Sequence, residues 1–193
     1  MVDNYSRDCR LYFAYGADMF EKYIKTRCFA PEFVAVAKLT GHRLAFFGYT
    51  HIWDGAQETL VPDKKQDVWG VVYRMSSYEG LEMDAYQDVR LDGAGQYFHY
   101  PVVVTDVNGN SHYPLMYKKN MLGVELPPSR PYMDIIIAGA QEKGLPADYI
   151  EGLKSRSTRT PKYEVPLPTM PRRVECAGCD DLLKKNSMRS RRR

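Results

Sequence analysis

The chain has 193 residues, 12% of them aromatic, which suits one globular domain and excludes a mainly disordered protein. Its formal net charge of +3 is unevenly distributed, because residues 172–193 carry eight of the 27 basic residues but only three of the 24 acidic ones. The first 171 residues therefore hold 19 basic and 21 acidic residues, a net charge of −2. This excludes a broadly basic domain surface, so we expect no nucleic acid as a partner.

The expected compartment of the protein and the redox state of its cysteines follow from features that the sequence lacks. It contains no apolar run of membrane-spanning length, and its first residues have no hydrophobic signal-peptide core, so we expect a cytoplasmic protein without a membrane partner. Four cysteines are too few and too scattered for a secreted disulfide framework. Cys176 and Cys179 form a C-x-x-C pair, but no second pair is spaced to complete a zinc site, so we interpret both as reduced thiols.

The first predicted unit is a strand, a glycine turn and a helix. Residues 10–15 are rich in aromatic side chains and are followed by Gly16, a pattern typical of a buried strand that enters a tight turn. In the helix that follows, Asp18 stands at the N-cap position and Glu21 comes three residues later, as in a capping box.

Three short strands and one helix are predicted next. The strands are at residues 42–47, 58–61 and 68–74. Each is rich in β-branched or aromatic residues and is bounded by Gly, Pro or Asp, and their close spacing favours antiparallel pairing. Ser76 and Glu79 then form a capping box, which predicts a short helix that ends near residue 87.

A hairpin and two helices complete the predicted elements. Residues 97–107 and 112–117 are apolar runs on either side of Asn108-Gly109, the strongest short-range hairpin signal. Beyond them the apolar residues recur at helical spacing, which predicts helices that start at Ser129 and at Pro146.

Together these elements predict a fold of class α+β. Residues 1–158 are expected to form one domain, with a mostly antiparallel or mixed sheet that is curled or closed and with helices outside it. Residues 159–193 are rich in Pro, Ser, Thr and basic residues and have little apolar periodicity, so we expect an extended basic C-terminal tail.

Three features of the sequence could carry chemistry. The turn Tyr15-Gly16-Ala17-Asp18 lets the backbone approach a ligand, and the helix N-terminus after it favours an anion. Three carboxylates near the end of the short helix could include a general base, although such side chains usually face solvent; they are Glu82, Asp84 and Asp88. A set of aromatic residues could line a pocket for a small polar ligand, namely Tyr97, Phe98, Tyr100, Tyr113, Tyr117 and Tyr132. Neither a metal-binding histidine spacing nor a serine-hydrolase motif is present in the sequence.

Several segments, in chain order, resemble motifs of the gamma-glutamylcyclotransferase family. Residues 12–18 are similar to the family's F-A-Y-G-S-N segment. Trp53-Asp54-Gly55 with Thr59, and then residues 67–73, are similar to its W-x-G-G-x-A-T and E-V-W-G-V-V-W/Y segments. Residues 83–89 stand where the family has L-D-x-x-E-G-V, and residues 127–149 resemble the C-terminal helices of the glutamyl-amino-acid type of these enzymes.

The resemblance implies a small β-barrel with flanking helices and a reaction without a cofactor or a metal. A γ-glutamyl group cyclises to 5-oxoproline and releases an amine or amino acid. The substrate's own α-amine attacks its γ-carbonyl, so the enzyme must fix the α-carboxylate and deprotonate the ammonium. By matching position, substrate binding falls on Tyr15, Gly16, Ala17, Asp18, Tyr97 and Tyr132. The resemblance also makes a homodimer an expectation.

The decisive departure from the family is Gln87, which stands where the family has its catalytic glutamate. A neutral amide cannot accept a proton at pH 7, and loss of a general base typically costs about 10² to 10⁴ in rate. The chain is therefore expected to bind a γ-glutamyl substrate and to turn it over poorly or not at all. Gln87 has two possible origins: an engineered Glu→Gln change, which we favour here, and a natural loss of the carboxylate.

Two other functions remain open. One is an enzyme that trims γ-glutamyl groups in glutathione-derived secondary metabolism, and the other is a non-catalytic protein that binds γ-glutamyl compounds.

Overall fold

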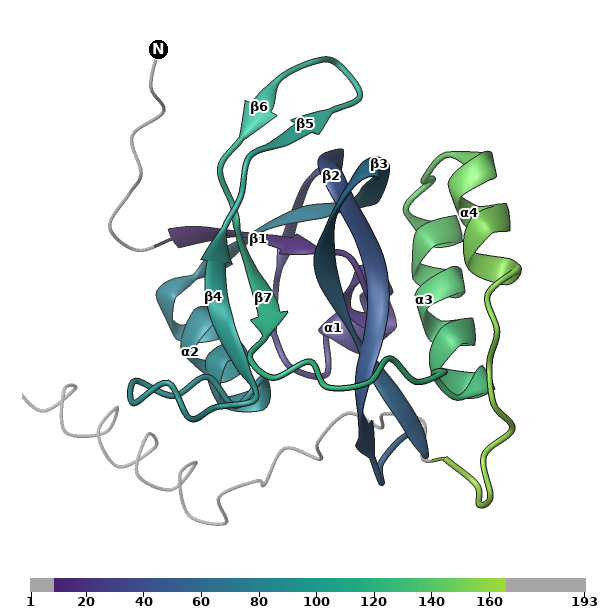
Figure 1. The fold of residues 1–193 in the computed structure, drawn as a ribbon. Coiled ribbons are helices and arrows are strands. Elements are labelled where there is room, and N and C mark those ends of the chain that lie inside the picture. Colours follow the sequence, from purple (N-terminus) through teal and green to yellow (C-terminus); the bar gives the residue numbers. More distant parts are fainter. Residues whose placement is uncertain (1–8, 166–193) are drawn as a thin grey trace, which may run out of the picture.

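The structure, a computed structural model, describes residues 9–165 (Figure 1). Its elements in chain order are β1 (Cys9–Ala14), η1 (Ala17–Met19, a 3₁₀ helix), α1 (Glu21–Ile24), β2 (Glu32–Thr50), β3 (Gly55–Ser76), α2 (Ser77–Tyr86), β4 (Tyr97–Pro101), β5 (Val104–Asp106), β6 (Ser111–His112), β7 (Leu115–Lys119), α3 (Arg130–Glu142) and α4 (Ala147–Lys154). Of the predicted basic C-terminal tail at residues 159–193, residues 166–193, which include Cys176 and Cys179, lie outside the described residues.

The strands form one curled, seven-stranded sheet in the order β4-β7-β1-β3-β2-β5-β6. Every strand pairing in it is antiparallel except that of β1 with β7. Within residues 9–165, β4 and β6 are the two edges of the sheet, which curls as a half-barrel (Figure 1). The predicted α+β class, with a mostly antiparallel and curled sheet and flanking helices, is confirmed.

Two long strands replace the three short ones that the sequence predicts. Residues 58–61 and 68–74 belong to the single strand β3, which pairs with β2 on both sides of residues 63–66. The register shifts between Thr40 and His42, opposite Pro62, and Gly41 has a φ of 69° there. Proline cannot donate to a sheet ladder but is tolerated at such an irregularity, so it does not end the strand.

The first predicted helix is divided into two short pieces. It consists of the 3₁₀ turn η1 and the four-residue helix α1, and the residue at the N-cap of η1 is Gly16. Asp18 is therefore not a helix cap, and that prediction is wrong. Its carboxylate instead accepts hydrogen bonds from side chains on β1 and beyond α1, which hold it in the interior.

The capping box before α2 is confirmed. The Glu79 N–H donates to Ser76 Oγ at 3.3 Å, and the Ser76 N–H donates to Glu79 Oε2 at 2.9 Å. We expect Ser76→Ala to lower the free energy of unfolding by about 1 kcal/mol, because the Glu79 N–H at the start of α2 loses its side-chain acceptor. Urea denaturation measures the change. Ser77→Ala, one residue further on and exposed, is the control and should change stability by less than about 0.5 kcal/mol.

The predicted hairpin is confirmed at its tip and interrupted further down. The Asn108-Gly109 turn joins β5 to β6, and Gly109 has the positive φ of 84° that such turns favour. Further from the tip the pairing is interrupted and then resumes as a second ladder, in which β4 pairs with β7. Figure 1 shows the β5–β6 tip projecting from the body of the sheet.

The two predicted C-terminal helices are confirmed as α3 and α4, which lie side by side on one side of the sheet (Figure 1). Helix α3 also packs against η1, which brings it to the turn after β1. Side chains from this junction and from the sheet form the core, where Phe13, Met19, Leu60 and Ile136 are fully buried. After α4 the chain runs back, and the Arg159 N–H donates to the Pro128 carbonyl at 2.9 Å.

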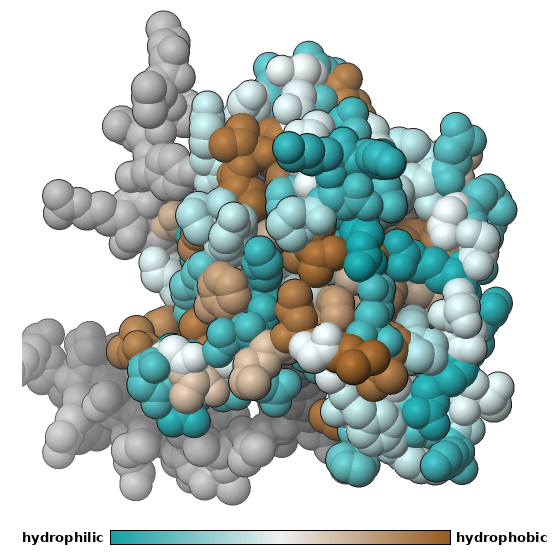
Figure 2. Space-filling model, viewed as in Figure 1, coloured by the Kyte–Doolittle hydropathy of each residue, from teal (hydrophilic) through white to brown (hydrophobic). Residues whose placement is uncertain are grey.

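The surface shown in Figure 2 is mostly hydrophilic, with apolar side chains in small separate groups. Among helices in the part of the chain that the structure describes, none is both long enough and apolar enough to cross a membrane.

Candidate active site

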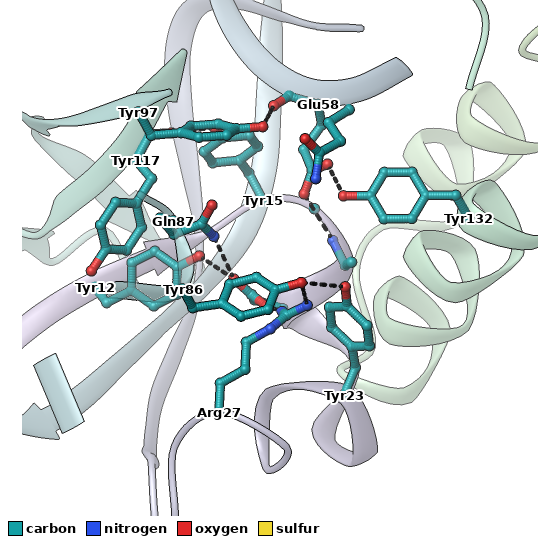
Figure 3. Close-up of a pocket in the computed structure, with 14 residues that line it drawn as sticks. Tyr12, Tyr15, Tyr23, Arg27, Glu58, Tyr86, Gln87, Tyr97, Tyr117 and Tyr132 are labelled. Carbon is teal, nitrogen blue, oxygen red and sulfur yellow. Dashed lines mark hydrogen bonds and ion pairs between the residues drawn. The ribbon is translucent and has the colours of Figure 1, made fainter. Parts of the chain in front are cut away.

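A pocket lies where the turn after β1 meets β3, β4, β7, α2 and α3 (Figure 3). Fourteen residues line it, and seven of these are tyrosines. The lining includes all seven residues that the family resemblance assigns to the site, which are Tyr15, Gly16, Ala17, Asp18, Gln87, Tyr97 and Tyr132. It also includes two charged residues that sequence reasoning missed, Arg27 and Glu58.

Gly16 is needed here for close approach and not for an unusual backbone angle. Its φ is −128°, which other residues also adopt. A Cβ atom on Gly16 would lie 2.0 Å from Glu58 Oε1, so a side chain at this position collides with the pocket's acidic wall unless Glu58 moves. The glycine turn therefore lets the Glu58 carboxylate rest directly on the backbone.

Asp18 and Arg27 form a buried ion pair in the pocket wall, and each side chain is only 5% exposed. The Arg27 guanidinium carbon lies 3.6 Å from the ring centroids of both Tyr23 and Tyr86, so two aromatic faces enclose the cation. Asp18 also accepts a hydrogen bond from the Tyr12 hydroxyl at 2.7 Å. The pair places one negative and one positive charge side by side in the wall of the pocket.

Gln87 is the C-cap residue of helix α2 and is one of the residues that line the pocket (Figure 3). Gln87 Nε2 donates a long, weak hydrogen bond of 3.5 Å to Asp18 Oδ2, so the amide nitrogen faces Asp18 and Oε1 is the acceptor of this side chain. Two departures from the family motifs, Asp18 and Gln87, therefore touch each other. The next residue, Asp88, has a φ of 49°, in the region that favours the glycine of the family motif.

Glu58 reaches into the pocket from β3, between the glycine turn and α3 (Figure 3). Its Oε1 accepts the Ala17 N–H at 3.3 Å, and its Oε2 accepts the Tyr132 hydroxyl. Burial raises the pKa of Glu58, and these two hydrogen bonds only partly oppose the effect. The sequence did contain a signal: Glu58 directly precedes Thr59, where the W-x-G-G-x-A-T segment has alanine.

The three carboxylates predicted around α2 do not line the pocket, so none of them faces a ligand there. Asp84 accepts hydrogen bonds from Arg10 at 2.8 Å, Tyr117 at 2.6 Å and His99 at 2.7 Å. Burial raises the pKa of Asp84, but these donors outweigh burial and lower it overall. Asp84 therefore ties α2 to β1 and the sheet edge.

Of the aromatic set predicted to line a pocket, Tyr97, Tyr117 and Tyr132 do so. Phe98 and Tyr100 are at least one-third exposed and lie outside it. The Tyr97 hydroxyl donates to the backbone carbonyl of Glu58 at 3.0 Å, which links β4 to β3 across the site.

The pocket is narrow in this conformation. Its cavity volume is about 20 Å³. In residues 9–165, no group of three or more His, Cys, Asp or Glu side chains is arranged to hold a metal ion.

Known proteins with similar sequences and folds agree on one family. A sequence model of the AIG2-like family matches residues 67–153. The gamma-glutamylcyclotransferases of Bos taurus and Homo sapiens are 31% and 33% identical to this chain over 150 residues, which is 75% of this chain and 77% of each relative. A solved structure named gamma-glutamyl cyclotransferase superposes with a TM-score of 0.76 at 27% identity, and covers 92% of this chain and 99% of its own.

The similarity to these relatives extends over three quarters of both chains, and the residues that the family motifs point to meet in one pocket. On this evidence the chain belongs to the gamma-glutamylcyclotransferase family.

Proposed function

We propose that the pocket binds the γ-glutamyl group of a γ-glutamyl amino acid or conjugate and cyclises it to 5-oxoproline with release of the amine. The observation that carries the proposal is the convergence of the seven motif-derived residues on one pocket. The common name of the relatives, gamma-glutamylcyclotransferase, supports the same reaction. The substrate supplies its own nucleophile, so the reaction needs positioning and proton transfer.

The binding roles follow from the groups that line the pocket. Backbone N–H groups of the turn from Tyr15 to Asp18 are suited to the substrate's α-carboxylate. The phenol groups of Tyr97 on β4 and Tyr132 on α3 line the same pocket. Gln87 Oε1 is suited to accept a hydrogen bond from the substrate's ammonium group, because Gln87 Nε2 already faces Asp18.

Gln87 cannot take the ammonium proton, so any turnover depends on another base. The rate loss of about 10² to 10⁴ expected from Gln87 applies to a pocket in which residue 87 is the only possible base. The Gln87–Asp18 contact supports a natural origin for this arrangement. An engineered Glu→Gln change would alter residue 87 alone. Here the residue that Gln87 contacts also departs from the family motif, because Asp18 stands where the motif has asparagine.

Release of 5-oxoproline from a panel of γ-glutamyl amino acids and γ-glutamyl conjugates tests the proposed function. The chain and its Gln87→Glu variant are measured in parallel, and the variant is expected to release 5-oxoproline because a carboxylate returns to the end of α2. The substrates that are consumed identify the leaving amine, including conjugates derived from glutathione. If neither protein releases 5-oxoproline from any substrate, the proposed function is wrong.

A non-catalytic binding protein is the second candidate, and the neutral amide at Gln87 is the observation that favours it. In that case γ-glutamyl compounds bind to both proteins with micromolar affinity in calorimetry, yet neither the chain nor Gln87→Glu releases 5-oxoproline.

A further inference from the structure

Two carboxylates, those of Asp18 and Glu58, line the pocket. Asp18 already has several partners. It is paired with the buried Arg27 guanidinium and accepts further hydrogen bonds from Tyr12 and Gln87. Both of its carboxylate oxygens already have partners, because Oδ1 is paired with Arg27 and Oδ2 accepts the Tyr12 hydroxyl. Asp18 therefore holds the wall of the pocket together and has neither oxygen left open for a substrate.

Glu58 has different surroundings. Both of its hydrogen-bond donors in the described part of the chain are neutral, the Ala17 N–H and the Tyr132 hydroxyl. No ion pair joins it to a Lys, Arg or His side chain within residues 9–165. When two carboxylates share a site and their environments differ in this way, the unpaired one is the candidate for acid–base work.

We propose that Glu58 binds the α-ammonium of the substrate and is the general base that residue 87 does not supply. This inference rests on the proposed function. Glu58 Oε1 touches the Ala17 N–H, one of the turn donors suited to the α-carboxylate. The α-carboxylate and the α-ammonium are bonded to the same carbon, so a substrate whose carboxylate occupies this turn presents its ammonium beside Glu58.

The hydrogen bond between Ala17 and Glu58 is one that a substrate can replace. The bond from Ala17 N to Glu58 Oε1 is 3.3 Å long, beyond the usual range for N–H···O, so it is weak. A charge-assisted bond from an ammonium to a carboxylate is roughly twice as strong as a neutral one. The entering zwitterion therefore draws Glu58 off the amide, and its own carboxylate takes the released Ala17 N–H. Tyr132, which donates to the other oxygen of Glu58, is a positioning residue.

The chemistry balances without water or any further reactant. Glu58 takes one proton from the α-ammonium, and the nitrogen lone pair attacks the γ-carbonyl carbon, which closes the five-membered ring. As the bond from this carbon to the leaving nitrogen breaks, protonated Glu58 gives its proton to that nitrogen. The attacking nitrogen loses a second proton as the ring forms, and the leaving group takes it up and departs as an ammonium ion.

The surroundings of Glu58 suit this role. Ionisable groups from every element around it act on its charge, namely Asp18 on η1, Tyr15 after β1, Tyr97 on β4, Lys119 on β7 and Tyr132 on α3. Burial is the largest influence and raises the pKa of Glu58, which brings a carboxylate base closer to neutral pH. A base works in its deprotonated form, so kcat/KM should fall as the pH drops through this raised pKa, at a higher pH than for an ordinary glutamate.

The experiment measures 5-oxoproline release by the full chain, by the Gln87→Glu variant and by four further variants. Glu58→Gln and Glu58→Ala are each expected to lower kcat by about 10² to 10⁴. Added formate should restore part of the activity of Glu58→Ala, and so should Gln87→Glu in the same chain, because each returns a carboxylate to the pocket. Glu32→Gln removes an exposed glutamate, paired with Arg74 on the surface, and is the control expected to keep full activity.

Each outcome decides the assignment. Unchanged kcat in Glu58→Gln overturns it, and so does a Glu58→Ala protein that is folded by circular dichroism but gains nothing from formate. An inactive parent chain with an active Gln87→Glu variant also overturns it, while the cyclotransferase proposal stands. If the parent chain and Gln87→Glu both fail to release 5-oxoproline, the proposed function itself is wrong.

Discussion

Replacing Arg27 by methionine is expected to lower the free energy of unfolding by about 3 to 5 kcal/mol, because the change leaves the Asp18 carboxylate buried without its cation. Both side chains are only 5% exposed, so water cannot take over the role of the guanidinium. The variant also removes the cation from between the Tyr23 and Tyr86 rings. Urea denaturation of the parent and variant chains, followed by circular dichroism, measures the difference.

The double variant Asp18→Asn/Arg27→Met separates the cost of an unpaired charge from the value of the pair. It should recover most of the lost stability, since replacing both members of a buried ion pair by neutral groups is often nearly neutral. Arg74→Met is the matched control, because Arg74 pairs with Glu32 on the surface at 3.0 Å and its loss should cost no more than about 1 kcal/mol. A double variant as unstable as Arg27→Met would contradict the explanation.

Replacing Gly139 by alanine should destabilise the chain by about 1 to 3 kcal/mol, although alanine is the better helix former. Gly139 lies on the buried face of α3, where this helix meets η1. A Cβ atom there would lie 2.4 Å from the backbone nitrogen of Phe20 and 2.8 Å from the carbonyl carbon of Met19. Backbone cannot rotate away as a flexible side chain can, so α3 and the turn before it must move apart.

Gly152 in α4 provides the opposite case within the same chain. A Cβ atom on Gly152 meets nothing within 4 Å, and the residue is exposed in a helix interior. Gly152→Ala should therefore raise the free energy of unfolding by about 0.5 to 1 kcal/mol. Thermal denaturation of the two variants compares them directly, and the same sign of change in both would contradict the packing argument. Only Gly139→Ala should also lower 5-oxoproline release, because it displaces the turn that carries Ala17.

Elements whose signals are local were predicted well from the sequence. The capping box at Ser76 and Glu79, the hairpin tip at Asn108-Gly109 and the helix from Ser129 all depend on residues a few positions apart, and all are present. The length of β3 was not predictable in this way. Its continuation past Pro62 depends on pairing with β2, a tertiary contact that overrides the local signal of a proline.

The same distinction between local signals and tertiary contacts applies to the site. The order of the motifs determined the family and the six residues expected to bind substrate, and the missing carboxylate at Gln87 can be read directly from the sequence. Only the tertiary structure showed that Asp18 is paired with Arg27 and that Glu58 stands unpaired beside the glycine turn. The physical reason is that the strength of a base depends on burial and on neighbouring charges, and residues 41 positions apart become neighbours only when the chain folds.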